Sequence, residues 1–241
     1  MVAPGGGDGG MRRGLPMWLV TAATRMELVA CLKRLEPGHS VSALITGIGP
    51  LESAVRLAVW LHRHGGKVRA VANVGVAGAY AAGGRGPAML DLCLARQEVL
   101  GDLGVCVGQG FERLSPAILD QVGMLELDQG LVERAARVLA RAGENLRCGP
   151  FVTVSSASGG FRRAAALGRE YDALCENMEG AAVARVCAEW GLPCLELRAI
   201  SNVAGERNKE RWRLAEAAAR AGEALARFLH HEAQDGVHAD D

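Results

Sequence analysis

Short apolar runs alternate along the chain with segments in which apolar residues recur every three or four positions. The apolar runs, which we expect to be strands, are Met17–Ala22, Val41–Thr46, Val68–Val74, Met89–Leu100, Leu146–Val154 and Cys194–Ile200. The segments with helical spacing are Met26–Leu35, Leu51–His64, Leu131–Ala142, Met178–Trp190 and Glu210–Leu229. Strand-then-helix alternation predicts an α/β fold with a largely parallel sheet that helices cover on both faces. Such sheets bind ligands in the loops beyond the carboxyl ends of their strands.

The alternating region predicts a single domain over residues 17–230, a length typical of one α/β domain. Residues 1–16 are rich in glycine and lack periodicity, so they are predicted to be a disordered tail. A second, polar tail is predicted for residues 231–241. The first apolar run follows two arginines, as in a short signal peptide, but charged residues come directly after it and we interpret it as the first strand. The candidate start residues are Met1, Met11 and Met17.

Charge and cysteine content argue against several classes of function. Lys and Arg together number 27, as do Asp and Glu, so a nucleic-acid or membrane-surface partner has no electrostatic support. No apolar stretch approaches the roughly 20 residues that a membrane-spanning helix needs. The seven cysteines lie mostly in apolar runs and include no CxxC pair, which is typical of buried thiols in a reducing compartment. We therefore expect a cytoplasmic protein without a disulfide framework or a zinc site.

Glycine-containing turns follow two neighbouring predicted strands. The segment Thr46–Ala54 reads TGIGPLESA and includes Gly49, and the segment Asn73–Gly78 reads NVGVAG. Glycines let backbone amides approach a ligand closely, but neither turn has the pattern of a Walker loop or of a dinucleotide-binding fingerprint. The turns are therefore either plain strand-to-helix connections or a shared cradle for a sugar or an anion, with Gly49 and Gly78 among its contacts.

The loop after the fifth predicted strand is rich in serine and glycine. It spans Val152–Gly160 and is either solvated or able to hold a heterocycle through Ser158, Gly159 and Gly160. No histidine follows a predicted strand, which argues against a Ser-His-Asp triad and against a histidine-rich metal site. Carboxylates and amides are then the remaining candidates for chemistry.

Polar residues stand where predicted strands end and predicted helices begin. Asn177 is a suitable N-cap, which would put Glu179 in the first helical turn, where the macrodipole favours a charged carboxylate. Glu179 is then either an acidic helix start or a carboxylate that accepts hydrogen bonds from two ribose hydroxyls. Asn202 follows the last predicted strand, either as a turn residue or as an amide presented to a ligand. Glu27 opens the first predicted helix as a second helix-start acid or as a general base.

Together these segments resemble the nucleoside phosphorylase and nucleosidase superfamily over almost the whole of residues 17–229. The shared motifs are GIG at 47–49, NVGVAG at 73–78, ENMEGAAVARVC at 176–187 and RAISN at 198–202. The resemblance implies a three-layer α/β/α fold around a mixed, largely parallel sheet, and a reaction that requires no metal and no organic cofactor. It also implies that Glu179 binds the ribose hydroxyls and that Met178 packs on the sugar face. The loop at 154–160 would hold the base through its backbone.

The side chain at position 202 distinguishes between branches of this superfamily. Methylthioadenosine/S-adenosylhomocysteine nucleosidases carry an Asp at the matching position, and its protonated form donates to purine N7. The amide of Asn202 can instead donate to a 6-oxo group and accept from a protonated N7. A 6-amino group would face the amide NH₂ with a second donor, and sites of this kind discriminate strongly. The expected base is hypoxanthine, with guanine as the second choice.

Two further features favour hydrolysis over phosphorolysis. Val76 stands where related enzymes often carry Ser or Thr, and Glu27 matches the water-activating glutamate of the nucleosidases, which would repel phosphate. The segment Gln97–Val105 resembles an E-V-x-x-D-L-G-V stretch of the futalosine hydrolase family, and residues 202–208 followed by Trp212 suit its Ser-Asn-x-x-G…W region. The resemblance thus implies hydrolysis of the N-glycosidic bond of futalosine to hypoxanthine and dehypoxanthinyl futalosine, a step of menaquinone biosynthesis.

The resemblance implies a dissociative mechanism in which Glu27 accepts a proton from the attacking water and Asn202 stabilises the departing base. Two departures from the family pattern are Asn177, where some relatives have a second Glu, and the SSASGG base loop.

Three alternative functions stay open: a methylthioadenosine/S-adenosylhomocysteine-type nucleosidase, a purine nucleoside phosphorylase and a catalytically silent nucleoside-binding relative. The family habit implies a homodimer or a homotetramer. The candidate cations for the carboxylate of futalosine are Arg25, Arg207 and Arg211.

Overall fold

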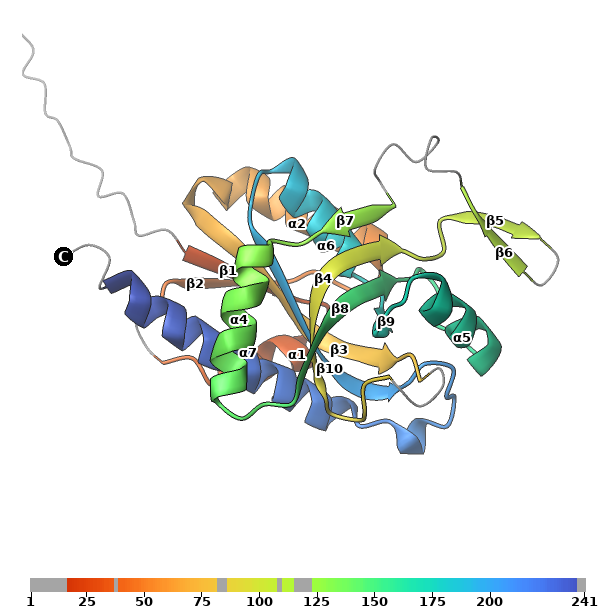
Figure 1. Cartoon of the computed structure of the whole chain (residues 1–241). Coiled ribbons are helices and arrows are strands. Elements are labelled where there is room, and N and C mark those ends of the chain that lie inside the picture. Colours follow the sequence, from red (N-terminus) through yellow and green to blue (C-terminus); the bar gives the residue numbers. More distant parts are fainter. Residues whose placement is uncertain (1–16, 37–38, 82–85, 108–109, 115–122, 238–241) are drawn as a thin grey trace, which may run out of the picture.

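The computed structural model describes residues 17–36, 39–81, 86–107, 110–114 and 123–237 (Figure 1). The tail predicted at residues 1–16 and the last four residues, 238–241, lie outside the described residues. The main sheet of the described chain has eight strands in the order β10-β4-β8-β9-β3-β1-β2, with β7 beside β4. The strands are β1 (Met17–Ala22), β2 (Val41–Ile45), β3 (Val68–Ala79), β4 (Leu92–Leu100), β7 (Met124–Glu126), β8 (Leu146–Thr153), β9 (Cys175–Asn177) and β10 (Cys194–Val203).

Parallel pairs predominate in this sheet, as the sequence predicted. Strands β1–β2, β1–β3, β3–β10, β4–β8 and β8–β9 pair in parallel, whereas β4–β10, β3–β9 and β4–β7 pair antiparallel. Strand β3 pairs with β10 as well as with β1 and β9, so the order closes on itself through β10, β4, β8 and β9. This closure brings β4 and β10 behind the junction between β9 and the helix that follows it.

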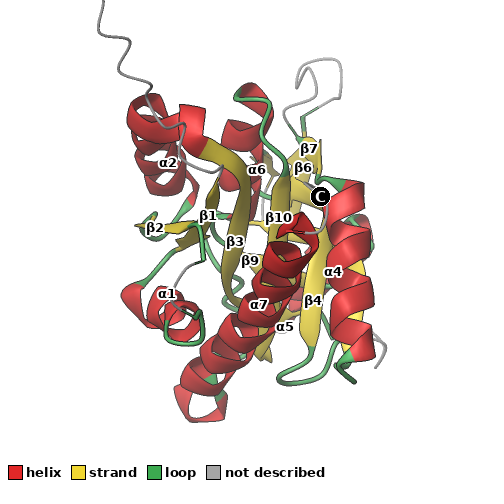
Figure 2. Ribbon diagram, turned by 90° about the vertical axis from the view of Figure 1, so that its left-hand side faces the viewer, coloured by secondary structure: helices red, strands yellow, loops and turns green. Residues whose placement is uncertain are grey.

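Helices cover both faces of the sheet, which confirms the predicted three-layer α/β/α fold (Figures 1 and 2). On one face α1 (Arg25–Leu32), α7 (Leu214–Val237) and α4 (Gln129–Arg141) pack side by side, and on the other face α2 (Pro50–His64) packs against α6 (Gly180–Glu189). Trp18 of β1 meets Phe228 of α7 edge to face, with the ring centroids 5.8 Å apart. None of the described helices is both long and apolar enough to cross a bilayer.

Several boundaries differ from the sequence prediction. Strand β10 continues to Val203 instead of ending at Ile200, and helix α7 begins at Leu214 and continues to Val237. Residues 231–237, predicted as the start of a polar tail, extend this helix, because a helix can propagate through polar residues once its apolar face is packed. The elements not predicted from the sequence are the hairpin β5 (Gly104–Val107) and β6 (Gly110–Arg113), strands β7 and β9, and helix α5 (Phe161–Glu170).

The turn between β2 and α2 depends on glycine. Gly47 and Gly49 have φ values of 82° and 93°, in the region that side chains with a Cβ rarely adopt. Pro50 then occupies the first position of α2, where its missing N–H costs no helical hydrogen bond. This turn leaves the backbone N–H of Gly49 free to meet a side chain from another part of the sheet.

Candidate active site

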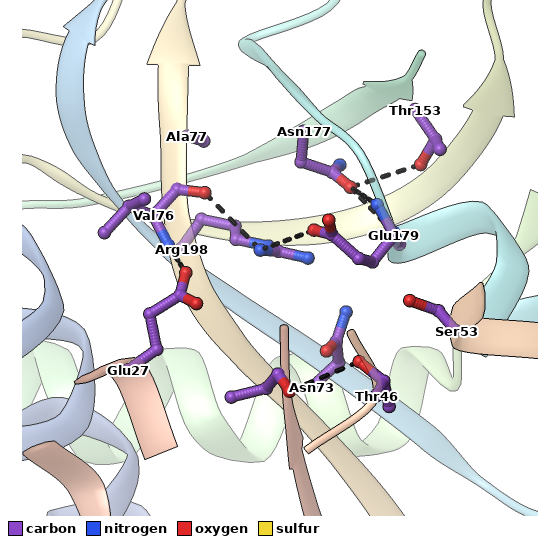
Figure 3. Close-up of polar contacts among 12 residues, drawn as sticks. Glu27, Thr46, Ser53, Asn73, Val76, Ala77, Thr153, Asn177, Glu179 and Arg198 are labelled. Carbon is purple, nitrogen blue, oxygen red and sulfur yellow. Dashed lines mark hydrogen bonds and ion pairs between the residues drawn. The ribbon is translucent and has the colours of Figure 1, made fainter. Parts of the chain in front are cut away.

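Two predicted carboxylates lie on either side of the guanidinium group of Arg198 (Figure 3). Glu27 comes from the first helix, α1, and Glu179 comes from the junction of β9 and α6. Arg198 reaches them from β10, and only 1% of its surface is exposed. The strand order of the closed sheet, and not proximity in sequence, brings these three charges together.

Glu27 has two sets of hydrogen-bond partners. In a capping box at the start of α1, the backbone N–H and the hydroxyl of Thr24 donate to Glu27 Oε2 at 3.1 and 2.6 Å. The backbone N–H of Val76 donates to the other oxygen, Oε1, at 3.0 Å. A carboxylate has about four lone-pair directions, so one direction on Oε1 is left for another donor such as water. Glu27 is therefore a helix-start acid whose geometry also permits the predicted role as a base.

Glu179 was predicted to lie in the first turn of its helix. It is instead the N-cap residue of α6, which begins at Gly180. Asn177 is the last residue of β9, and its Oδ1 accepts from the backbone N–H groups of Glu179 and Gly180 at 2.9 and 2.7 Å. Asn177 thus caps the helix from two residues before the N-cap position. The predicted boundary was wrong because β9 pairs with β8 and β3, which holds residues 175–177 in extended conformation.

The side chain of Glu179 is fixed at both oxygens. Its Oε1 accepts from the backbone N–H of Gly49 at 3.1 Å, and its Oε2 lies 3.6 Å from Nη1 of Arg198. Burial raises the pKa of Glu179, and Arg198 and the Gly49 amide act against this increase. Gly49, predicted as a ligand contact, thus lies beside Glu179, and its amide donates to that carboxylate.

Arg198 carries the positive charge of the site. Its burial disfavours the charged form, but Glu196, Glu179 and Glu27 around it raise the pKa of Arg198. Nε of Arg198 donates to Glu196 Oε1 at 2.8 Å, and Nη1 donates to the backbone carbonyl of Val76 at 3.4 Å. Within the described chain, Nη2 of Arg198 has no hydrogen-bond partner. A buried donor without a partner is costly, so this N–H group is suited to a polar group of a ligand.

Asn202 lies inside β10, next to Gly78 of β3. The register of the two strands shifts between Ile200 and Asn202, and Asn202 then pairs with Gly78. The hydroxyl of Ser201 donates to Asn202 Oδ1 at 2.9 Å, and Asn202 Nδ2 donates to the Val203 carbonyl at 3.1 Å. These contacts use one N–H and one lone pair of the amide and leave one of each. A Cβ on Gly78 would lie 3.2 Å from Asn202 Nδ2, so glycine keeps the amide accessible.

Ser158 of the predicted base loop turns inward. Its backbone N–H and its hydroxyl both donate to the buried carboxylate of Glu176, at 2.9 and 2.6 Å, and only 3% of its surface is exposed. The hydroxyl of Tyr80 donates to the same carboxylate at 3.3 Å. Ser158 therefore anchors the loop, and Gly159 and Gly160 are the more exposed positions of the three. Met178 is half-buried between β9 and α6, beside Glu179.

Four buried charged residues of this region had no role predicted from the sequence. They are Glu98, Glu176, Glu196 and Arg198. A signal was present, because charged residues inside an apolar strand run, as in C-L-E-L-R-A-I at 194–200, are rarely buried without partners. Apart from the Glu196–Arg198 pair within β10, their partners lie on other elements and could not be identified from the sequence.

The three arginines proposed for the substrate carboxylate are not brought together. Arg25 is exposed at the start of α1. Arg211 pairs with Glu206 at 2.9 Å, whereas the guanidinium of Arg207 lies 5.8 Å from the ring centroid of Trp212. Among the described residues, no group of three or more His, Cys, Asp or Glu side chains is arranged to hold a metal ion.

The fold and these residues define a class of protein. A sequence model of the phosphorylase superfamily matches residues 25–231. That range includes both carboxylates, Arg198 and Asn202. The chain therefore belongs to the phosphorylase superfamily.

Individual relatives identify the family within it. The chain is 35% identical to a futalosine hydrolase of Thermus thermophilus, over 90% of this chain and 96% of that protein. It is 32% identical to a futalosine hydrolase of Streptomyces coelicolor, over 82% of this chain and 81% of that protein. Within the superfamily, the chain belongs to the futalosine hydrolase family. A 5'-methylthioadenosine/S-adenosylhomocysteine nucleosidase of S. pneumoniae, solved with a transition-state inhibitor, has a similar structure, with a TM-score of 0.74, 25% identity and coverage of 88% of this chain and 98% of that one.

Proposed function

We propose that this protein hydrolyses the N-glycosidic bond of futalosine and releases hypoxanthine and dehypoxanthinyl futalosine, as a step of menaquinone biosynthesis. The observation that carries the proposal is the arrangement of Glu27 and Glu179 on either side of Arg198, in a chain whose relatives include two futalosine hydrolases. The amide of Asn202 lies at the neighbouring strand pair. Such a site has the groups that a hydrolase of nucleosides requires and needs no cofactor.

The proposed mechanism is dissociative. The bond between the ribose and the base lengthens first, and positive charge develops on the sugar while negative charge develops on the base. Glu179 orients the ribose hydroxyls and stabilises the sugar cation, since its carboxylate is held in place by the Gly49 amide and by Arg198. Glu27 then accepts a proton from the attacking water through the free direction on Oε1.

Selection of the base is assigned to Asn202. Its unused N–H would donate to the 6-oxo group of hypoxanthine, and its unused lone pair would accept from protonated N7. The hydrogen bond to the 6-oxo group grows stronger as negative charge accumulates on the departing base, which is the requirement for catalysis by binding. Gly159 and Gly160 are the loop positions proposed to contact the base.

Product analysis tests this function directly. Futalosine, aminofutalosine, inosine and methylthioadenosine should be incubated with the purified protein, with and without phosphate. We expect hypoxanthine from futalosine, at a rate independent of phosphate, and much slower turnover of the other three. Release of ribose 1-phosphate derivatives would support a purine nucleoside phosphorylase, and preference for methylthioadenosine would support the nucleosidase alternative. Failure to turn over any of the four would favour the catalytically silent relative.

The carboxylate of the substrate is proposed to bind Arg207. Arg211 is less suited, because Glu206 already neutralises it, whereas the Arg207 guanidinium contacts only the face of Trp212 among the interactions described for it. Arg207→Ala should therefore raise KM for futalosine by about tenfold, as expected for a lost charge-assisted hydrogen bond, and leave inosine unaffected. Arg211→Ala is the matched control on the same loop. Equal effects of Arg207→Ala on futalosine and inosine would contradict this role.

The proposal also includes the oligomeric state of the protein and its cellular compartment. Helix α2 exposes an apolar stripe at every fourth residue, and Leu51, Val55 and Val59 are 78%, 52% and 46% exposed. Such a stripe suits an interface between identical subunits, and we propose a homodimer or a homotetramer, which sedimentation analysis can test. Free cysteines, most of them buried, suit a reducing compartment, and we propose the cytoplasm as the compartment of the reaction.

A further inference from the structure

Two carboxyl groups meet behind the proposed site, outside the groups used in the mechanism. Glu98 of β4 and Glu196 of β10 are both fully buried, and their strands are antiparallel neighbours. A Cβ added to Gly180 would overlap with carboxylate oxygens of both residues. The first residue of α6 is thus a glycine because these two carboxyl groups occupy the space of its side chain.

The two carboxyl groups differ in their partners. Glu196 Oε1 accepts from the charged Nε of Arg198 at 2.8 Å. Glu98 has neutral partners only: Nδ2 of Asn177 at 2.6 Å from Oε1, and the Thr153 hydroxyl at 2.8 Å from Oε2. A buried carboxylate without a cation is far more costly than a neutral carboxyl group in the same place. Glu98 is therefore the member of the pair that is suited to remain protonated.

The protonated form completes a ring of hydrogen bonds. Hydroxyl hydrogens rotate to suit their partners, so Glu98 can donate to Thr153 Oγ1 over the same 2.8 Å. The Thr153 hydroxyl then donates to Asn177 Oδ1 at 3.2 Å, and Asn177 Nδ2 donates back to Glu98 Oε1. Asn177 Oδ1 also accepts from the backbone N–H of Glu179. Every donor in the ring has an acceptor, and the ring ends on the residue proposed to bind the ribose.

The surroundings of Glu98 agree with a neutral group. The pKa of Glu98 is raised well above its ordinary value, first by burial and then by Glu196, against the effect of Thr153, Asn177 and Arg198. Arg198 is directed at Glu196, Glu179 and Glu27. The other titratable groups near Glu98 are the buried thiols of Cys175 on β9 and Cys194 on β10, which supply no positive charge.

We propose that Glu98 is a neutral carboxylic acid that positions Glu179 through Asn177, and that Glu196 is the carboxylate that positions Glu179 through Arg198. Two chains of contacts then hold the ribose-binding residue, one at its backbone N–H and one at its Oε2. The inference rests on the proposed function, because it takes Glu179 as the ribose-binding residue. Neither Glu98 nor Glu196 touches the substrate in this arrangement, so both are positioning residues.

Substitution by glutamine and by alanine separates the two roles. Gln at position 98 can donate to Thr153 and accept from Asn177, as the neutral acid does, so Glu98→Gln should keep kcat/KM within about threefold at pH 7, whereas Glu98→Ala should lose at least about tenfold. Glu196→Gln removes the charge that holds Arg198 and should also lose at least about tenfold. Asp91→Asn is the control for an isosteric change at a buried carboxylate, at the other end of β4.

The pH dependence of stability provides a readout that needs no substrate. A carboxyl group whose pKa is higher in the folded state keeps its proton on folding, so its stabilising effect is complete below the unfolded pKa of about 4.3 and is lost as the pH rises toward the folded value. The Tm of the unmodified protein should therefore fall more steeply than that of Glu98→Gln as the pH rises above about 4.3. Its kcat/KM should also show an alkaline decline that Glu98→Gln lacks.

An infrared measurement on the unmodified protein covers the case in which a variant does not fold. A protonated carboxyl band at pH 7 that is absent from Glu98→Gln supports the proposal, and the unmodified protein alone suffices to overturn it. Absence of the band, equal losses in Glu98→Gln and Glu98→Ala, or equal Tm slopes would overturn it. If the unmodified protein cleaved another nucleoside instead of futalosine, the proposed substrate would fail, and the same comparisons on that nucleoside would still test the positioning pair.

Discussion

Glu27→Gln is expected to lower kcat for futalosine by about 100-fold or more and to leave KM nearly unchanged. The amide cannot accept the proton of the attacking water, and water without a base is a weak nucleophile toward the ribosyl cation. Gln is also accepted at this position of a capping box, so α1 should still form. Steady-state kinetics at saturating futalosine, with circular dichroism as a check on folding, measure the effect.

Thr24→Val is the matched control for Glu27. It removes the hydroxyl that donates to Glu27 Oε2 at 2.6 Å and also removes the side-chain cap of α1, at a cost of about 1 kcal/mol in stability. The carboxylate and its contact with the Val76 amide would remain. Turnover should therefore fall far less than in Glu27→Gln. If Glu27→Gln turned over futalosine at a near-normal rate, Glu27 would not be the base, and part of the case for hydrolysis would be lost.

Asn202→Asp should weaken hydrolysis of futalosine by roughly 10- to 100-fold, which corresponds to the loss of about 1–3 kcal/mol for an unpaired acceptor. A charged carboxylate has no N–H to donate to the 6-oxo group. It would also face the carbonyl of Val203, to which Asn202 Nδ2 donates at 3.1 Å. The variant should gain activity on aminofutalosine relative to futalosine, because a carboxylate accepts from a 6-amino group. Measurements of kcat/KM on futalosine and aminofutalosine, for Asn202→Asp and for the unmodified protein, test this expected change in selectivity.

Asn208→Asp is the matched control for this change. Asn208 lies in the loop that follows β10, where its side chain accepts from the backbone N–H of Glu210 at 3.1 Å. Asp can make the same contact, so the variant should keep the activity and selectivity of the unmodified protein. Equal kcat/KM values for futalosine and aminofutalosine in the unmodified protein would refute the assignment of the base to Asn202. The enzyme would then belong with the adenine-cleaving branch.

Local patterns in the sequence determined the larger elements of the fold. All six predicted strands were found, because each is an apolar run of the length and composition typical of strands in a largely parallel sheet. Strand β9 was missed because Cys175–Asn177 is too short and too polar to be recognised. Its extended conformation depends on pairing with β8 and β3. The same pairing moved the start of α6 from the predicted Met178 to Gly180.

The candidate site residues also divide into those whose place follows from local sequence signals and those whose orientation depends on tertiary contacts. Glu27, Glu179 and Asn202 stand beside glycine turns and helix starts, which are local signals, and the structure brings the two carboxylates to one Arg198. Ser158 has an equally local signal, but the structure turns it toward Glu176. The side chain of a serine in a glycine-rich loop can point inward or outward. Its orientation depends on whether a buried carboxylate lies within hydrogen-bond distance on the inner side.

The sequence by itself determined the α/β class, the resemblance to a family of N-ribosyl hydrolases and the residues at the strand ends, because these depend on periodicity and on motifs within a few positions. Only the tertiary structure decided which charges share one site. Glu98, Glu196 and Arg198 come from two strands that the closed sheet makes neighbours, and the electrostatic energy of a buried charge depends on partners within a few ångströms. Glu98 is far from Glu196 and Arg198 in the sequence, so the neutral state proposed for Glu98 follows from the packing alone.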